Sequence, residues 1–280
     1  MALLVTEAIV LHAFDYLESS RIVRLVTSDG GMRSALAKGA RKSRRRFGSG
    51  LDLFAQGTAH LHTRPGRDLD TLSAFEDVIT RTALAEDLER FTGAETIAEI
   101  VLAFGREGAD VELFDAVAHA LDTLSIRSGA AAREATLAGV WQIVASLGFT
   151  PAMDACAECD SALASDEPAL FVHSAGGILC ARCAALSSGG RRLPAAARAT
   201  IAGWMQGASL GSNDPRQPRP RLNAEAVLAE SREPRAEAVL DDAVLAAHQR
   251  LLREFLGYHL HDGRSLRAFD MWERAGWSAA

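Results

Sequence analysis

Residues 20–37 read SRIVRLVTSDGGMRSALA, which is two apolar-rich runs on either side of an Asp-Gly-Gly turn. Valine, isoleucine and leucine dominate the first run, and such residues favour β-strands. The turn Asp29–Gly31 favours a hairpin, because glycine adopts the positive φ angles that tight hairpin turns require. The second run, Met32–Ala37, continues directly into a basic segment. We therefore predict a β-hairpin over residues 20–37.

Three further segments near the N-terminus carry strand patterns. They are Val5–Phe14, Leu53–Thr63 and Leu69–Val78, and a turn-like Arg-Pro-Gly-Arg sequence separates the last two. Within Leu53–Thr63, small and apolar residues share alternate positions, which is the period of a strand with one buried face. Five short strands with turn signals between them predict a small β-barrel or sandwich.

The hydrophobic pattern changes near Thr80. From there to Pro151 alanine and leucine dominate, and apolar residues recur at helical spacing. This pattern predicts a bundle of three or four helices. Pro194–Gln206 and Val239–Leu260 also have helical patterns, whereas Gly207–Arg221 reads as a loop or linker rich in glycine, proline and arginine.

The composition is that of an ordinary globular protein with two or three domains. The chain has 280 residues, of which 48% are hydrophobic and 24% are charged. It contains no run of eighteen apolar residues, so we expect no membrane span. The N-terminal segment lacks the basic start and the cleavage site of a signal peptide, so we expect a cytoplasmic protein.

Charge is distributed unevenly along the chain, whose net charge is −6. Residues 1–80 hold 11 basic and 9 acidic side chains, and the remaining residues hold 19 and 27. The first part therefore has a net charge of +2 and the rest a net charge of −8. Salt screens charges beyond about 10 Å, so an anionic polymer responds to local charge rather than to the total. The N-terminal part is thus the candidate for contact with nucleic acid.

All four cysteines of the chain lie in two Cys-x-x-Cys pairs. Cys156 and Cys159 form the first pair, Cys180 and Cys183 form the second, and twenty residues separate the two. Each Cys-x-x-Cys turn directs two thiolates to one point, so two turns complete a tetrahedron around Zn²⁺. The spacer contains Phe-Val-His and Gly-Gly-Ile, which predicts a short hairpin. Paired disulfides are the alternative, and a cytoplasmic chain favours zinc.

We expect the zinc to be structural and the protein not to be an enzyme. A catalytic zinc needs an open coordination position, and four cysteines leave none. A nucleobase deaminase would carry a His-x-Glu element before its cysteine pair, and this chain has none. It also lacks the Gly-x4-Gly-Lys-Ser/Thr motif of nucleotide hydrolases. The histidine pairs His60/His62 and His259/His261 are weaker metal candidates.

The segment Arg33–Arg46 is strongly basic. No acidic residue occurs between Asp29 and Asp52, so its seven positive charges have no compensating carboxylate within the run. Such a density favours contact with a phosphate backbone over a merely solvated face. Glycines on both sides predict a mobile loop between strands. The predicted nucleic-acid-binding residues are Arg33, Lys38, Arg41, Lys42, Arg44, Arg45 and Arg46.

Neighbours of this segment are open to two interpretations. Phe47 follows the arginine triplet and is as well suited to core packing as to stacking on a base. Arg21 and Arg24 precede the segment on the first strand of the hairpin. They either extend the basic track or are ordinary exposed strand positions.

The stretch Leu36–Gly48, LAKGARKSRRRFG, resembles the KGARR-S-RFG element of the RecO family of recombination mediators. The end of the chain, LHDGRSLRAFDMW at 260–272, is also similar to that family. The resemblance implies an α+β multidomain fold. Its parts would be an N-terminal OB-fold β-barrel at 1–79, an α-helical domain at 80–150 and 191–280, and a four-cysteine zinc-finger insertion at 151–190.

The same resemblance implies a non-enzymatic role in DNA repair and recombination in the bacterial cytoplasm, in association with the nucleoid. RecO-like proteins bind single- and double-stranded DNA and anneal complementary strands. With RecR they help to load RecA onto DNA coated with single-stranded-DNA-binding protein (SSB). The positions that match as DNA contacts are Lys38, Arg41, Lys42 and Arg44–Arg46. The alternative is a zinc-stapled helical protein-interaction module with an incidental basic loop.

Overall fold

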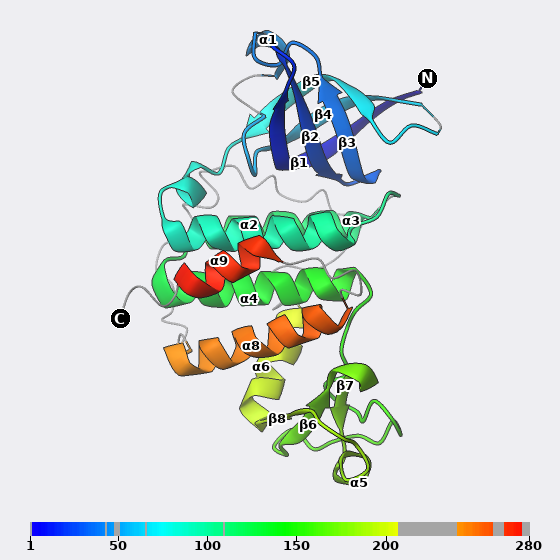
Figure 1. Cartoon of the computed structure of the whole chain (residues 1–280), viewed down its shortest axis with the longest axis vertical. Helices are drawn as coiled ribbons and strands as arrows, with labels where there is room; N and C mark the ends of the chain where they lie inside the picture. Colours follow the sequence, from blue (N-terminus) through cyan, green and yellow to red (C-terminus); the bar gives the residue numbers. More distant parts are fainter. Residues whose placement is uncertain are drawn as a thin grey trace, which may run out of the picture.

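The computed structural model describes most of the chain. It covers residues 2–42, 44–47, 51–64, 66–108, 110–206, 240–259 and 266–275, without the side chains of Arg44, Arg45 and Ala275. The linker predicted at Gly207–Arg221 and the candidate ligand His261 lie outside the described residues. Figure 1 shows the β-barrel at one end of the molecule, layers of helices in the middle and a small sheet at the other end.

Five strands form the N-terminal barrel, which confirms the barrel predicted from the sequence. Neighbours pair in the order β1-β2-β3-β5-β4, and β4 pairs back with β1. Every pair is antiparallel except β3 with β5. The strands are β1 (Ala2–Tyr16), β2 (Ser20–Thr27), β3 (Gly31–Ala37), β4 (Gln56–Thr63) and β5 (Asp70–Ile79).

The hairpin predicted at 20–37 is confirmed as the antiparallel pair of β2 and β3. Thr27 and Gly31 face each other across the turn, and the Thr27 hydroxyl donates to the Gly31 carbonyl at 2.8 Å. Gly31 has a φ of +61°, and a Cβ there would lie 2.2 Å from the Gly108 carbonyl oxygen. Only glycine fits this position, because both the dihedral and the close backbone approach exclude a side chain.

A single helical turn, α1 (Arg44–Phe47), corrects the prediction of a loop at these residues. Phe47 is 2% exposed and packs inside the barrel in one cluster with Leu51 and Phe75. Burial of an aromatic side chain is strongly favourable, so Phe47 anchors the basic segment to the barrel. The structure therefore places Phe47 in the core and not on the surface that a base could reach.

The helical patterns predicted beyond Thr80 are confirmed, and the helices lie in layers beneath the barrel (Figure 1). Asp87 and Asp110 begin the first two α-helices, because each carboxylate accepts a hydrogen bond of 2.9 Å from a backbone amide three residues ahead. The described helices of this part are η1 (Thr82–Ala85), α2 (Leu88–Phe104), α3 (Val111–Ser125), α4 (Gly129–Ser146), α6 (Ala195–Gln206), α8 (Asp242–His259) and α9 (Arg267–Ala275).

Helix α9 lies within the part that the resemblance assigns to the helical domain, although no individual helix is predicted there. It is nine residues long, and Phe269 and Trp272 are its buried anchors. The backbone amides of Ala268 and Phe269 donate to the Glu99 carboxylate of α2 at 3.0 and 3.2 Å. A residue that is distant in the sequence therefore satisfies the amides at the start of this helix.

One hydrophobic core joins the barrel, the helices and the small sheet. Ile9 and Leu11 of β1 point out of the barrel and pack in the same cluster as the buried faces of the helices. Trp141 of α4 is fully buried in that cluster, with its ring centroid 5.2 Å from that of Phe255 in α8. Phe171 extends the cluster into the small sheet, since its ring lies 6.1 Å from Phe255.

Arg81 links the barrel to the helices. Its side chain is 4% exposed. The guanidinium donates to the Phe54 carbonyl and to Gln56 Oε1, both at 2.8 Å, and to Asp122 Oδ1 of α3 at 2.7 Å. The planar guanidinium carries five N–H donors, so it can serve three acceptors from one buried position.

The small sheet contains β6 (Ala169–Val172), β7 (Gly177–Leu179) and β8 (Arg191–Leu193) in the order β7-β6-β8. The hairpin predicted between the cysteine pairs is confirmed as β6 and β7. Strand β8 is a correction, because residues 191–193 pair with β6 although the resemblance assigns them to the helical domain. The one-turn helices η2 (His173–Ala175) and α5 (Ala181–Ala184) complete this unit.

Burial of His248 predicts acid sensitivity of the helical part. The ring is 3% exposed and lies 4.9 Å from that of Trp204, and burial lowers its pKa to about 4. The unfolded chain binds a proton near pH 6.5, so stability is lost as the pH falls from there towards 4. We expect His248→Gln to remove roughly 3 kcal/mol of this pH dependence.

The measurement is urea unfolding of wild type and His248→Gln at pH 7, 6, 5 and 4.5, followed by tryptophan fluorescence. Above pH 7 the two proteins should show a constant difference in stability, because His248 is then neutral in both states. Parallel stability curves across the acid range would contradict the prediction. His119→Gln is the control, since His119 is an exposed residue of α3.

Candidate metal centre and nucleic-acid interface

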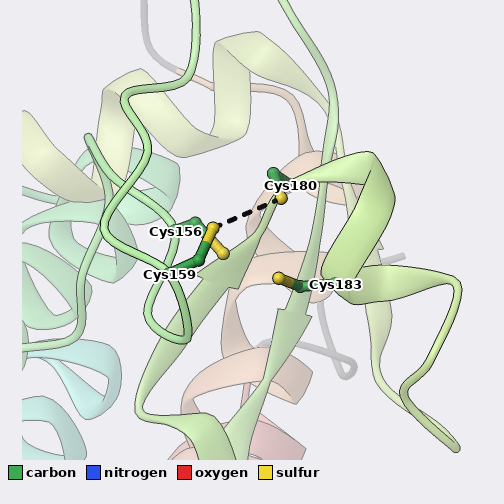
Figure 2. Close-up of side chains that lie close together, drawn as sticks. All are labelled: Cys156, Cys159, Cys180 and Cys183. Atoms are coloured by element: carbon green, nitrogen blue, oxygen red, sulfur yellow. Dashed lines mark hydrogen bonds between the residues drawn. The ribbon is translucent and has the colours of Figure 1, made fainter.

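The four cysteines come from two turns that the small sheet brings together (Figure 2). Cys156 and Cys159 lie before β6, and Cys180 and Cys183 lie at the start of α5, directly after β7. The first turn is closed by the Asp160 amide, which donates to the Cys156 carbonyl at 2.8 Å. The second is closed by an amide of α5 in the same way. Each turn therefore presents two sulfur atoms to the same point.

The sulfur geometry fits a single tetrahedral metal ion. All four Sγ atoms lie within 4.8 Å of one another, and the Cys159 and Cys180 atoms are 3.8 Å apart. A tetrahedron with metal–sulfur bonds of about 2.3 Å has sulfur atoms about 3.8 Å apart. All four residues are free cysteines, so the structure does not contain the alternative paired disulfides. The predicted grouping of the four residues is confirmed.

The thiols of this cluster interact strongly with one another and with Ser161. A hydrogen bond from the Ser161 hydroxyl is the main cause that lowers the pKa of Cys159 to about 6. A hydrogen bond to Cys159 is the main cause that raises the pKa of Cys183 to about 12. A divalent cation would be held by all four sulfur atoms as thiolates.

The described histidines of the weaker candidate pairs, His60, His62 and His259, are not part of a group of three or more metal ligands. Among the residues that the structure describes, the four cysteines are the group of three or more ligands that could hold a metal ion. His60 Nε2 lies 3.4 Å from the Glu76 carboxylate, across the β4–β5 pair. The ring of His259 packs 4.5 Å from that of Phe255.

The basic segment lies at the end of the barrel that faces away from the helices, around α1 (Figure 1). Its turn is held by the Lys42 amide, which donates to the Gly39 carbonyl at 3.0 Å, and by the Arg41 amide, which donates to Ser19 at 3.1 Å. Arg46 reaches back and donates to the Lys38 carbonyl at 3.1 Å. The exposed cations that the structure describes here are Lys38, Arg41, Lys42 and Arg46.

Arg33 lies apart from these cations. It is on β3 five residues before Lys38, which is roughly 16 Å along an extended strand. Its side chain is 23% exposed, lies 3.8 Å from Asp70 and 3.6 Å from Glu107, and donates to the Gly30 carbonyl. Burial raises the pKa of Asp70, and the Arg33 charge opposes that shift. The structure does not bring Arg33 together with the rest of the predicted set.

The two arginines of β2 differ in their surroundings. Arg21 lies at the same barrel end as Arg41, and both guanidiniums contact Asp15, at 3.1 and 3.6 Å. Arg24 donates to the Leu102 carbonyl of α2 at 3.5 Å, at the junction with the helices. Arg21 therefore extends the basic surface, whereas Arg24 belongs to the packing of the barrel on the helices.

Two family models match this chain. The model for the N-terminal part of recombination protein O matches residues 1–81, and the model for its C-terminal part matches residues 85–222. This chain belongs to the RecO family. Membership supports a role in DNA repair and recombination, and it agrees with the α+β fold.

RecO-family relatives resemble the chain over much of its length. The DNA repair protein RecO of Anaeromyxobacter sp. (strain K) is 38% identical over 63% of this chain and 68% of its own. That of Anaeromyxobacter sp. (strain Fw109-5) is 32% identical over 93% of this chain and 91% of its own. That of Rubrobacter xylanophilus is 35% identical over 65% of this chain and 72% of its own.

The described residues of the RecO-like element, 36–42 and 44–47, occupy the end of β3, the following turn and α1. No helix within the described ranges is long and apolar enough to cross a membrane. Two exposed aromatic side chains of β1, Phe14 and Tyr16, are not among the binding residues predicted from the sequence. Their spacing in the sequence could have indicated them, because residues two apart in a strand share one face and these two form an aromatic pair on that face.

Proposed function

We propose that this RecO-family chain binds single- and double-stranded DNA, anneals complementary strands and, with RecR, helps to load RecA onto SSB-coated single-stranded DNA. In this proposal the protein is not an enzyme, and it works on the chromosome in the cytoplasm. The observation that carries it is the group of exposed cations around α1 in a chain that belongs to the RecO family. Arg44 and Arg45, whose side chains the structure does not describe, complete the proposed contact.

The physical basis of annealing is charge neutralisation. Two complementary strands repel each other through their phosphates, and a surface that holds both backbones reduces this repulsion. The cations project from a short turn and one helical turn, both tied to a buried core by Phe47. Lys38 and Lys42 have no carboxylate within 4.0 Å among the described residues, so their charge is available to phosphate.

Backbone contacts carry no sequence information, so the proposed binding is nearly independent of DNA sequence. The cysteine cluster has a separate role in the proposal: it holds a structural Zn²⁺ that ties the turns before β6 and after β7. Four thiolates fill the coordination shell, and the ion itself does not take part in DNA binding.

The test compares wild type with Lys38→Ala/Arg41→Ala/Lys42→Ala and with Arg44→Ala/Arg45→Ala/Arg46→Ala. We expect each triple variant to lose roughly 10- to 100-fold in DNA affinity near 0.1 M salt, because up to three phosphate contacts are removed. The slope of log K against log salt should flatten by about 2 to 3 units for duplex DNA. Fluorescence annealing of complementary, SSB-coated oligonucleotides, with and without RecR, should slow in the same variants.

The matched control removes three exposed arginines from the other parts of the molecule, Arg192, Arg250 and Arg274. It changes the net charge by the same amount and should leave the salt slope nearly unchanged. Equal losses in the control and in the test variants would contradict a localised DNA surface. Unchanged DNA binding in both triple variants would favour the alternative of a protein-interaction module with an incidental basic loop.

A further inference from the structure

The outer face of β1 carries aromatic side chains that the barrel does not bury. His12, Phe14 and Tyr16 occupy alternate positions, and the rings of His12 and Phe14 are 5.8 Å apart. Phe14 is 44% exposed and Tyr16 is 41% exposed. Exposing aromatic surface to water is unfavourable, so a cluster of exposed rings on one strand indicates a surface that a ligand covers.

The helices cover only part of this outer face. Ile9 and Leu11 of β1, together with Val26 of β2, are buried against them. Beyond the irregularity in pairing between Val10 and His12, the described helices no longer cover the face. Phe14 pairs with Ile22, which is half-buried, and Tyr16 pairs with Ser20, which is buried, so the uncovered part is confined to the end of β1.

The uncovered aromatic residues adjoin the cations of the basic segment. Arg41 contacts the β1–β2 turn directly: its amide donates to Ser19 at 3.1 Å and its guanidinium to the Glu18 carbonyl at 3.5 Å. The same guanidinium lies 3.6 Å from Asp15, the residue between Phe14 and Tyr16. Asp15 points to the opposite face of β1 from Phe14 and Tyr16. The cation of Arg41 and the aromatic pair therefore lie on the two sides of the same strand end, beside the β1–β2 turn that Arg41 contacts.

A ring surface beside cations is complementary to a single nucleic-acid strand. Phosphates require positive charge, and unpaired bases stack on exposed aromatic rings without regard to sequence. A duplex offers the phosphates but keeps its bases paired and stacked inside. Asp15 counts against phosphate binding, but it is 52% exposed, and such exposed ion pairs are weak enough for phosphate to replace the carboxylate.

We propose that Phe14 and Tyr16 form a stacking surface for unpaired bases of single-stranded DNA, next to the phosphate contacts at Arg41 and Lys42. This inference rests on the proposed function, because it assumes that the barrel end binds DNA. The inference adds a way for the protein to distinguish single-stranded from duplex DNA. The cations bind the phosphates of either form, whereas the aromatic pair stacks only on unpaired bases. The surface thereby favours the substrate that must be annealed over the duplex product.

The experiment measures affinities for a dT oligonucleotide, an abasic oligonucleotide of equal length and a duplex. We expect Phe14→Ala/Tyr16→Ala to lose about 10- to 100-fold in affinity for the dT strand and less than twofold for the duplex. Wild type should bind the abasic strand as weakly as the double variant binds dT. The double variant should not distinguish dT from the abasic strand. The conservative variant Phe14→Tyr/Tyr16→Phe should retain the wild-type preference.

The matched control is Leu3→Ala/Val5→Ala, which removes exposed apolar side chains from the other end of the same strand. Thermal unfolding of all variants shows whether they remain folded. An equal loss for duplex and single strand, or no loss for either, overturns the stacking surface while the DNA-binding proposal stands. Failure of wild type to bind any DNA overturns both, and failure of the cation variants alone to weaken binding overturns the proposed phosphate surface.

Discussion

Cys156→Ser/Cys180→Ser is expected to abolish the proposed binding of one Zn²⁺ per chain and to unfold the outer half of the small sheet. One residue is removed from each Cys-x-x-Cys turn, so neither turn can complete a tetrahedral site. The part of the small sheet around the cysteines has little apolar core of its own. Its outer cluster contains Val172 and Leu179 as buried apolar side chains besides Cys156.

The two faces of this sheet predict where unfolding stops. Phe171 and Ile178 pair across β6 and β7 and belong to the main core, whereas Val172 and Leu179 point to the cysteines. The inner face remains packed on the helices when the metal is lost. Structural zinc contributes roughly 10 kcal/mol or more to small isolated units, and here part of that free energy is replaced by the core. We therefore expect local unfolding and not loss of the whole fold.

Metal content by mass spectrometry and hydrogen exchange of residues 154–187 measure the two effects. The exposed Ser187→Ala change serves as a control in the same unit. DNA affinity should stay within about twofold of wild type, because the barrel lies at the other end of the molecule (Figure 1). Wild-type hydrogen-exchange protection in the metal-free double variant would refute a stabilising role for the ion.

Arg81→Met is expected to destabilise the protein by about 3 kcal/mol, since it removes three hydrogen bonds of one buried guanidinium. The Phe54 carbonyl and Gln56 lose their charged donor, and the Asp122 carboxylate loses its partner. Asp122 is 32% exposed, so water can solvate its carboxylate. The loss of stability therefore stays near the lower end of the range for removing one partner of a buried ion pair. The barrel and the helices should then unfold less cooperatively.

Two probes separate these parts. The tryptophans that the structure describes, Trp141, Trp204 and Trp272, lie on helices, so fluorescence reports on the helical part, whereas circular dichroism reports on the whole chain. In the variant we expect the two urea transitions to diverge. Arg253→Met is the control: its ion pairs with Asp270 and Glu273 are 43% exposed at the arginine, so we expect at most about 1 kcal/mol. A comparable loss in both variants would contradict the special role of Arg81.

Much of the fold follows from local pattern. The hairpin at 20–37 was predictable because a glycine turn and β-branched runs are properties of adjacent residues. The helices at 88–104, 111–125 and 129–146 follow from apolar spacing, and the starts of the first two from aspartate caps. The metal cluster was predictable because each Cys-x-x-Cys turn builds half of the site by itself.

Other features depend on residues that are far apart in the chain. Glu99 caps α9 from 169 residues away, and β8 exists because β6 offers it an edge. The charge of Arg33 suggested a phosphate contact, but Asp70 and Glu107 surround it in the folded protein. Side-chain type alone cannot reveal such partners.

Adjacent residues therefore settled most of the strands and helices, the cysteine grouping and the presence of a basic segment, because backbone geometry imposes its period over a few residues. The folded chain decided which side chains of that segment face solvent and which are buried. It placed Phe47 inside the barrel and left Phe14 and Tyr16 outside. The physical reason is that exposure is set by what packs against a residue, and packing joins segments that the chain holds far apart.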